Sequence, residues 1–262
     1  MGYPSSLQAY MSGQLLGASR DNLMLASQGL DSNIILVNSV SSGNDVIIAK
    51  QGINNLEELK GKSVAVEKGL FSDLLFTTAM EDAKIDLNEV NVVNAATAEL
   101  SQIFATPNID AVVLWQPYGL QALKASPGSK VIYDSTQKPG LIYDVLAVNM
   151  PNIQNRKDEW RKLILVWDKV IQYLENPETR DDAIQIMAKR ASVDPKVLAG
   201  LLSGTTFLDL EDNKKLFEKN DKLTSIYGSA YHVNEFNLRT GIYPTSPNVD
   251  NTIYPELVES LK

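Results

Sequence analysis

Short apolar runs alternate with amphipathic stretches through the first 150 residues of the chain. The runs are rich in β-branched residues, which favours strands that are buried on both faces of a sheet. The predicted strands cover residues 34–37, 45–49, 63–66, 90–93, 111–115, 131–133 and 145–148. Helical spacing of apolar side chains predicts helices between them, at 54–61, 72–83, 99–105 and after Pro117. The alternation implies an α/β fold with a mostly parallel sheet and helices on its faces.

The chain changes character after Pro151, where helical spacing replaces the strand-like runs. The clearest example is 160–174, in which apolar residues recur three or four positions apart. Further helices are expected at 180–191, after Asp194-Pro195, at 213–227 and at 254–261. No stretch reaches the roughly 18 consecutive apolar residues of a membrane-spanning helix.

The composition excludes several kinds of site. The 262 residues include no cysteine and one histidine, His232, and 32 acidic residues outnumber 24 basic ones to give a net charge of −8. Disulfides, zinc fingers, iron–sulfur clusters and thiol nucleophiles are therefore excluded, and so are sites that need two imidazoles. A Ser-His-Asp triad lacks the G-x-S-x-G motif that would supply its serine. The acidic balance argues against nucleic acids and anionic membranes as partners.

Ligands of such sheets lie at the carboxyl ends of strands and near helix N-termini, which directs attention to three loops. The first contains Gly69, Leu70, Phe71 and Ser72, between a strand and a helix. Gly69 permits a tight turn and Ser72 can cap the helix, so free N–H groups could bind an anionic or polar group. An ordinary strand–helix turn would use the same residues, and the phosphate-binding pattern G-x-x-x-x-G-K-[ST] is absent from the sequence.

The other two loops carry aromatic and small polar residues. Trp115 and Tyr118 can enclose a small organic ligand, and Gln116 can hydrogen-bond to it, although Trp115 could equally be a core residue. Ser42 and Asn44 lie in a turn that could present hydroxyl and backbone donors, or could be a plain turn.

Two isolated titratable residues are also candidates for ligand binding or catalysis. Asp144 stands at the start of an apolar strand, where it could accept a ligand's N–H group or cap neighbouring backbone donors. His232 lies in the helical part without an obvious catalytic companion, which favours a structural or surface role. The carboxylates are dispersed, so no acid–base pair is expected.

Several segments resemble, in their order, the solute-binding proteins of ABC importers. They are Ser12-Gly13-Gln14-Leu15, the helix around Asp21-Asn22-Leu23, Gln28-Gly29-Leu30, residues 55–66, Gly69 with Ser72, residues 108–117 and residues 143–148. Together they are similar to the nitrate/sulfonate/taurine type, also called NMT1-like or SsuA-like. Residues 42–45, 105–107 and 134–135 resemble the branch found beside urea carboxylase genes.

This resemblance implies a type-II periplasmic-binding-protein fold, with two α/β lobes joined by two crossing strands and a helical C-terminal tail. It assigns residues 1–47 and 144–262 to one lobe and 48–143 to the other, with hinges near 45–48 and 143–145. The ligand is expected in a cleft between the lobes, against the candidate residues above. We also expect an N-terminal truncation, because family members begin with a signal peptide, a strand and a helix. Residues 15–19 also lack the family's usual aspartate.

The implied function is that of a periplasmic or extracellular membrane-associated protein that delivers a small sulfonate-, taurine- or nitrate-like solute to an ABC permease and ATPase. We expect a monomer without catalytic residues, metal or cofactor, and without insertion into the membrane. Urea- or guanidine-like compounds and pyrimidines are alternative ligands, and a ligand-sensing domain is an alternative role. The related pyrimidine synthases share the fold, but that enzyme class implies a cysteine-rich iron motif, which this chain cannot form.

Overall fold

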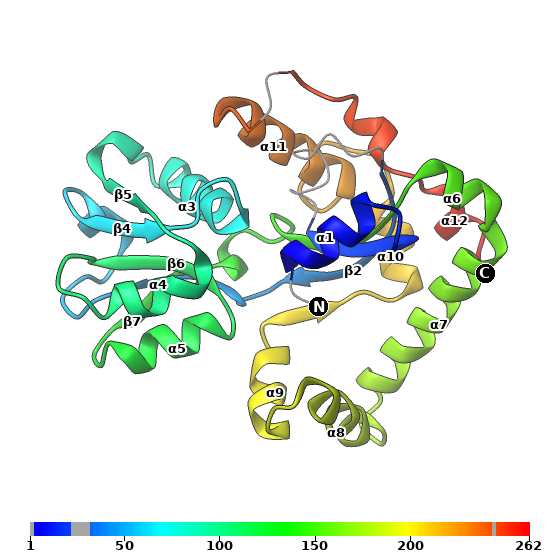
Figure 1. Ribbon diagram of the computed structural model, residues 1–262, viewed down its shortest axis with the longest axis horizontal. Helices are drawn as coiled ribbons and strands as arrows, with labels where there is room; N and C mark the ends of the chain where they lie inside the picture. Colours follow the sequence, from blue (N-terminus) through cyan, green and yellow to red (C-terminus); the bar gives the residue numbers. More distant parts are fainter. Residues whose placement is uncertain (1–2, 22–31, 243–244) are drawn as a thin grey trace. The chain divides into compact units, whose positions relative to one another are not determined.

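The computed structural model describes residues 3–21, 32–242 and 245–262. The chain forms two compact units, each with its own sheet and helices (Figure 1). Unit 1 comprises Met1–Val40, Ile142–Leu202 and Thr206–Lys262, and unit 2 comprises Ser41–Leu141 and Ser203–Thr205.

Unit 2 is built on a five-stranded sheet with the order β5-β4-β6-β3-β7. Its strands are β3 (Asp45–Ala49), β4 (Ser63–Val66), β5 (Asn91–Asn94), β6 (Ala111–Trp115) and β7 (Lys130–Asp134). β4 is parallel to β5 and β6, whereas β3 is antiparallel to both β6 and β7. The expectation of a mostly parallel sheet is therefore wrong for the strand pairings around β3. Strands β4, β5, β6 and β7 follow one another through the α-helices between them, as parallel strands require. β3 comes before the first of these crossovers.

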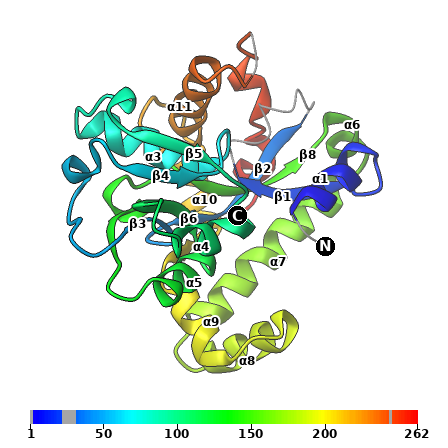
Figure 2. The ribbon, with the colours of Figure 1, turned by 60° about the vertical axis from the view of Figure 1, so that its left-hand side comes forward.

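The helices of unit 2 lie close to their predicted positions. They are η1 (Leu56–Leu59), α3 (Phe71–Asp82), η2 (Leu87–Glu89), α4 (Thr97–Phe104), α5 (Tyr118–Ala125) and η3 (Ser135–Gln137). The helix predicted at 54–61 is a short 3-10 turn, capped by the Asn55 side chain at the Glu58 N–H. Figure 2 shows α4 and α5 beside β6, where α4 and α5 bury Leu100, Phe104 and Ala122 against Val112 and Leu114.

Unit 1 has a four-stranded sheet with the order β1-β8-β2-β9. The strands are β1 (Gly17–Asp21), β2 (Asn33–Ser41), β8 (Tyr143–Val148) and β9 (Thr205–Phe207), and β8 is antiparallel to both β1 and β2. Ile34–Val37 of β2 are buried without interruption, as expected for a strand that is covered on both faces. A helix was expected around residues 21–23, but residue 21 belongs to strand β1. Residues 22–23 and the motif at 28–30 lie outside the described residues.

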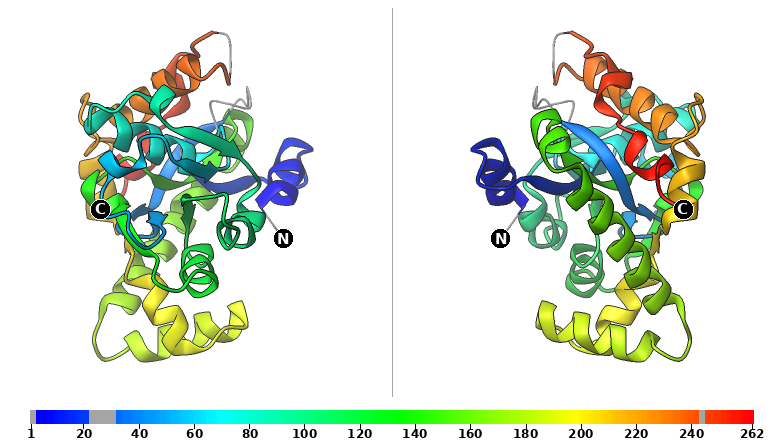
Figure 3. Two further views of the ribbon diagram at one scale, coloured as in Figure 1. Left: turned by 90° about the vertical axis from the view of Figure 1, so that its left-hand side faces the viewer. Right: turned by 90° about the vertical axis from the view of Figure 1, so that its right-hand side faces the viewer.

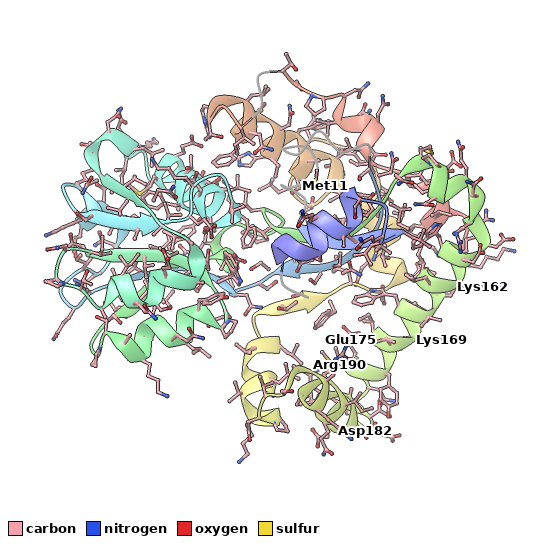
Figure 4. The ribbon with its side chains drawn as sticks, viewed as in Figure 1. Met11, Lys162, Lys169, Glu175, Asp182 and Arg190 are labelled. Carbon is pink, nitrogen blue, oxygen red and sulfur yellow. The ribbon has the colours of Figure 1, made fainter. Side chains whose placement is uncertain are left out.

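Helices make up most of the rest of unit 1 (Figure 3). They are α1 (Tyr3–Met11), α6 (Met150–Asn155), α7 (Lys157–Glu175), α8 (Arg180–Ala191), α9 (Pro195–Leu202), α10 (Leu210–Leu216), α11 (Ile226–Arg239), η4 (Val249–Thr252) and α12 (Glu256–Glu259). α7 buries Trp160, Ile164, Ile171 and Leu174, and Figure 4 shows the charged side chains of Lys162, Lys169 and Glu175 on the same helix. None of the helices in the described ranges is long and apolar enough to cross a membrane.

The C-terminal helices differ from the prediction in one place. The pattern at 213–227 predicts one helix, but α10 ends at Leu216 and α11 begins at Ile226. Each of the two helices has its own N-terminal cap. Asp209 accepts the N–H of Asp212, and Ser225 accepts that of Tyr227. The helix predicted at 254–261 is reduced to Glu256–Glu259.

The points at which the chain passes between the units also differ from the expected lobe boundaries. The main changes fall after Val40 and after Leu141, not after residues 47 and 143, and the chain returns briefly to unit 2 at Ser203–Thr205. Residues 45–48, expected as a hinge, are buried in β3 between β6 and β7, and residues 143–145 are in β8 between β1 and β2. A hinge role for these two segments stays a prediction.

Candidate functional site

The carboxyl ends of β4 and β6 bring two of the predicted loops together in unit 2. Because these strands are parallel neighbours, the residues that follow them emerge at the same edge of the sheet. Phe71 begins α3, and its ring packs on Trp115 with centroids 4.4 Å apart. Tyr118 begins α5 and lies edge-on to Trp115 at 5.7 Å. We call Phe71, Trp115 and Tyr118 the aromatic cluster; all three are half-buried.

The first turn of α3 contains polar groups without partners. Leu70 is the N-cap in an extended conformation, and its side chain makes no capping bond. The N–H groups of Phe71 and Ser72 have no acceptor among the described residues, as is usual for the start of a helix. Ser72 lies inside the helix and is 1% exposed, and its Oγ has no hydrogen-bond partner in that part of the chain either. The expectation that Ser72 caps the helix is therefore wrong.

A carboxylate closes the loop before α3. Gly69 has a φ of +78°, a conformation that favours glycine, and its N–H donates to Oδ2 of Asp73 at 2.9 Å. Desolvation raises the pKa of Asp73, and the Gly69 hydrogen bond and the charge of Lys68 oppose that rise. The Gly69 N–H is therefore already hydrogen-bonded, and the expectation that it is a free donor is wrong. Asp73 was not predicted to have a role, although a position three residues after the N-cap is typical of such a contact.

The second acidic residue of this loop has a role in a neighbouring helix. The Glu67 carboxylate accepts the backbone N–H of Thr97 at 2.7 Å and the Thr97 hydroxyl at 2.6 Å. Glu67 therefore caps α4, whose N-cap Ala96 has no side-chain acceptor. Lys68 is exposed, and its backbone N–H donates to the side chain of Asn94.

Gln116 caps α5. Its Oε1 accepts the Leu120 N–H at 3.0 Å, and its own N–H donates to the Asn44 carbonyl at 3.0 Å. A Cβ at Gly119 would lie 2.8 Å from the Gln116 Nε2, so glycine at that position leaves room for the folded-back amide. A hydrogen bond from Gln116 to a ligand stays a prediction, and it would have to come from the Nε2 group.

The turn at 41–45 is fixed by hydrogen bonds within unit 2. The Ser42 N–H donates to the Gly204 carbonyl at 2.8 Å, and the Asn44 amide donates to the Thr205 hydroxyl. Ser135 Oγ lies 2.7 Å from the Ser41 hydroxyl and accepts the Gly43 N–H. The pairing of Asp45 with Trp115 places this turn beside the end of β6.

The sequence does not predict the partners of this turn. Ser135 and Thr205 are 94 and 161 residues away from the residues they contact. Nothing local in the sequence marks such contacts, so the packing of Ser135 and the 203–205 segment was not foreseen. Binding of a ligand by Ser42 and Asn44 stays a prediction.

Asp144 lies in unit 1, on β8. Ser39, its cross-strand neighbour on β2, donates to Oδ2 of Asp144 at 2.8 Å. Desolvation raises the pKa of Asp144, and the Ser39 hydrogen bond opposes this. Because Asp144 is exposed to solvent, water limits the rise in its pKa. The second carboxylate oxygen has no partner among the described residues, so Asp144 can accept a further hydrogen bond.

Metal-binding clusters are absent from the described part of the chain, in which no three His, Cys, Asp or Glu side chains converge. His232 is a residue of α11, among Tyr231 and Val233. Neither observation points to an acid–base centre.

The chain is similar to known binding proteins. A putative binding protein of Brucella abortus is 33% identical over 84 residues, which are 32% of this chain and 26% of that protein. A putative aliphatic sulfonates-binding protein of Bacillus subtilis is 25% identical over 196 residues, 74% of this chain and 55% of that protein. The chain therefore spans between about a quarter and about half of the length of these curated relatives.

Solved structures have the same fold. The periplasmic aliphatic sulphonate binding protein SsuA from Escherichia coli superposes with a TM-score of 0.77 at 18% identity, covering 96% of this chain and 79% of that one. The alkanesulfonate-binding protein SsuA from Xanthomonas axonopodis gives 0.72 at 14% identity, covering 96% and 84%. The desulfurization enzyme DSZB gives 0.66 at 12%, covering 94% and 85%. The expected type-II binding-protein fold is confirmed.

The family assignment comes from a family-wide sequence pattern. Residues 16–180, well over half of the chain, match the NMT1/THI5-like family. The narrower resemblance to the urea carboxylase branch stays a prediction. The chain belongs to the NMT1/THI5-like family.

Proposed function

We propose that this chain is the solute-binding component of an ABC-type importer and that its ligand is a sulfonate-like organic anion. The family, the fold and the names of the relatives in Bacillus subtilis and Escherichia coli, both putative aliphatic sulfonates-binding proteins, support this proposal. In the cell, the protein would act outside the inner membrane, as a monomer, and present its ligand to a permease and ATPase. Binding without turnover is the proposed mode of action.

The first turn of α3 carries the proposal. The Phe71 and Ser72 N–H groups and the Ser72 hydroxyl are three donors without acceptors in the described part of the chain. A helix N-terminus adds a partial positive charge to such donors. A sulfonate has three oxygen atoms that can accept hydrogen bonds, so its head group matches this donor set in both number and charge.

The aromatic cluster would hold the organic part of the ligand. Phe71 belongs to both features, because its N–H is one of the donors and its ring stacks on Trp115. Ser42, Asn44 and Gln116 lie beside the end of β6 and are kept as further contacts of unit 2. Asp144 of unit 1 is also proposed as an acceptor for a ligand's N–H group, because only one of its carboxylate oxygens accepts a hydrogen bond in the described part of the chain.

A thermal-shift and calorimetry screen tests the proposed function. Methanesulfonate, taurine, nitrate, urea, guanidine and cytosine would each be added to the purified chain. A ligand that binds the folded state raises the melting temperature, by about 5 °C at a hundredfold excess over Kd. We expect sulfonates to do so, and Ser72→Ala to weaken their binding about tenfold, the cost of a hydrogen bond to a charged group.

The same screen can contradict the proposal. His232→Ala is the control, because this residue lies outside the proposed site and its loss should leave the affinity unchanged. If urea or a pyrimidine raised the melting temperature and no sulfonate did, the ligand would be one of the alternative compounds and not a sulfonate. Recovery of a chemically altered sulfonate would make the chain an enzyme and not a binding protein.

A further inference from the structure

We infer that α7 binds a helix of another protein, and that acidic residues border the apolar stripe of that helix. This role is separate from ligand binding in unit 2 and does not rest on the proposed function. It follows from a face of α7 that unit 1 leaves exposed.

α7 is apolar on two faces, although a surface helix needs only one such face to pack on its core. The buried face consists of Trp160, Ile164, Ile171 and Leu174. A second set of apolar side chains, each between 42% and 59% exposed, consists of Leu163, Val166, Val170 and Tyr173. We call these four residues the outer stripe. Packing within unit 1 does not account for the outer stripe, because its side chains keep so much of their surface in water.

The outer stripe has the spacing that contacts between helices use. Its positions are separated by three, four and three residues, like the a and d positions of a coiled coil. At its end, the Tyr173 hydroxyl donates to Oδ2 of Asp182 on α8 at 2.7 Å. Ile186, one turn after Asp182, is 60% exposed and continues the apolar surface onto α8.

Exposed apolar surface is concentrated in this part of the molecule. Of the twelve large apolar side chains that are exposed in the described residues, seven lie between positions 163 and 197. Single exposed apolar residues are normal on a protein surface, whereas a contiguous group of them marks an interaction site.

Two lysines without partners border the outer stripe. Lys162 lies four positions before Val166 and Lys169 three positions after it, so both are neighbours of the stripe on the same side of the helix. Both are exposed and are labelled on α7 in Figure 4. The other basic residues of the helix, Lys157 and Arg161, form ion pairs. Neither Lys162 nor Lys169 has an ion-pair or hydrogen-bond partner among residues 3–21, 32–242 and 245–262. Two acidic side chains on a docked helix would supply these partners.

Other occupants fit this face less well. A second copy, packed antiparallel so that the two stripes coincide, would bring the lysines of both copies to the same border, where like charges repel. Anionic membranes are typically recognised by clusters of roughly four to eight basic residues, and this border has two. The outer stripe and Ile186 are also far fewer than the roughly 20–30 residues on each side of a standard protein interface. A single helix matches an apolar strip of this size.

The local charge does not oppose an acidic partner, despite the net charge of −8. Residues 157–202, which include α7, α8 and α9, contain eight basic and eight acidic residues and are neutral as a segment. The excess of acidic residues therefore lies elsewhere in the chain. Because salt screens charges beyond about 8 Å at physiological ionic strength, an acidic helix on α7 would be affected mainly by the two lysines.

Fluorescence anisotropy of the full chain with two labelled helical peptides tests the inference. Both peptides are about three heptads long and have leucine at a and d, but one has glutamates beside the leucines and the other has lysines. We expect the acidic peptide to bind at least about tenfold more tightly than the basic one. The reason is that Lys162 and Lys169 meet opposite charges in the first complex and like charges in the second.

Two double variants assign the binding to this face. Val166→Ser/Val170→Ser removes apolar contacts and should weaken binding of the acidic peptide about tenfold. Lys162→Glu/Lys169→Glu should reverse the preference, so that the basic peptide binds more tightly. All four side chains are exposed, so each variant should keep its melting temperature within about 3 °C of wild type.

Matched controls lie outside α7. Met11→Ser changes a residue of α1 that is 53% exposed, and Lys62→Glu/Lys124→Glu changes the net charge by the same amount in unit 2. Both should bind the acidic peptide as tightly as wild type does. A calorimetric titration with methanesulfonate reports on the proposed function separately, and the α7 variants should keep that affinity within about twofold.

Several outcomes would overturn the inference. One is that neither peptide binds, and another is that both bind equally well. A dimer that sediments as such in the wild type and is lost in Val166→Ser/Val170→Ser would make a second copy the occupant. Binding to phosphatidylglycerol vesicles that requires Lys162 and Lys169, without binding of the acidic peptide, would make the face a membrane contact.

Discussion

Asp73 puts a negative charge within the first turn of the helix at which an anion is proposed to bind. Its carboxylate holds the Gly69 N–H, and burial raises its pKa above the ordinary value of 3.8. The residue therefore has two opposite effects: it shapes the loop through a hydrogen bond and repels the proposed ligand through its charge.

Replacing Asp73 by Asn separates these two effects. The amide oxygen can still accept the Gly69 N–H, but the charge is gone. We expect Asp73→Asn to bind methanesulfonate about two- to fivefold more tightly, as expected for one charge near a helix N-terminus. Titration calorimetry measures this, with Glu99→Gln in the first turn of α4 as the control. Weaker binding by Asp73→Asn would mean that the carboxylate assists the ligand.

The raised pKa of Asp73 also predicts how the stability of the protein depends on pH. A carboxyl whose pKa is raised in the folded state stabilises the protein below its unfolded-state pKa, and that contribution is lost as the pH rises through the folded-state value. Relative to wild type, Asp73→Asn should therefore gain stability as the pH rises from about 3.8 towards neutrality. Urea denaturation at pH 4 and pH 7 checks the sign of this difference.

At the scale of elements, Asn213 fixes α10 to β2. The residue is fully buried, and its side chain accepts the Val37 N–H at 2.7 Å and donates to the Val37 carbonyl at 2.9 Å. Both are backbone groups of β2, whose register partner in β8 at this point is Val145. The amide thus takes the place of a neighbouring strand.

The loss of that amide should be costly. Asn213→Ala would leave both Val37 groups buried without partners, and we expect it to lower the free energy of unfolding by about 2–4 kcal/mol. Asn155→Ala, at an exposed position of α6 in the same unit, should change it by less than about 0.5 kcal/mol. Urea unfolding followed by circular dichroism compares the two variants. Equal losses would show that the hydrogen bonds to Val37 contribute little.

The elements themselves were largely predictable, and the contacts between them were not. Apolar runs located β4 and β6, and helical spacing located α7 and α8, because those patterns are local. The direction of β3 depends on its neighbours β6 and β7, which no local pattern encodes. The same holds within the candidate site. Trp115 and Phe71 were correctly expected at strand and helix ends, but the capping by Gln116 and the burial of Ser72 depend on tertiary packing.

At the scale of the whole molecule, the net charge of −8 opposes the approach of any anion. Salt screens this field, since the Debye length falls from about 30 Å at 0.01 M to about 8 Å at 0.15 M. We expect the association rate of benzenesulfonate to rise about two- to threefold over that range, as measured by stopped-flow tryptophan fluorescence. A rate that falls with salt would indicate that a local positive field outweighs the net charge.

The short return of residues 203–205 to unit 2 has a consequence for cutting the protein into pieces. Gly204 supplies the acceptor for the Ser42 N–H, and Thr205 the acceptor for the Asn44 amide. Both lie more than sixty positions beyond Leu141, where the main segment of unit 2 ends. Excision of residues 41–141 as one continuous piece would leave the turn before β3 without its partners. An isolated unit 2 would need the tripeptide grafted back. A deletion of 203–205 from the whole chain would loosen the turn and would also remove Thr205, the first residue of β9, from the sheet of unit 1.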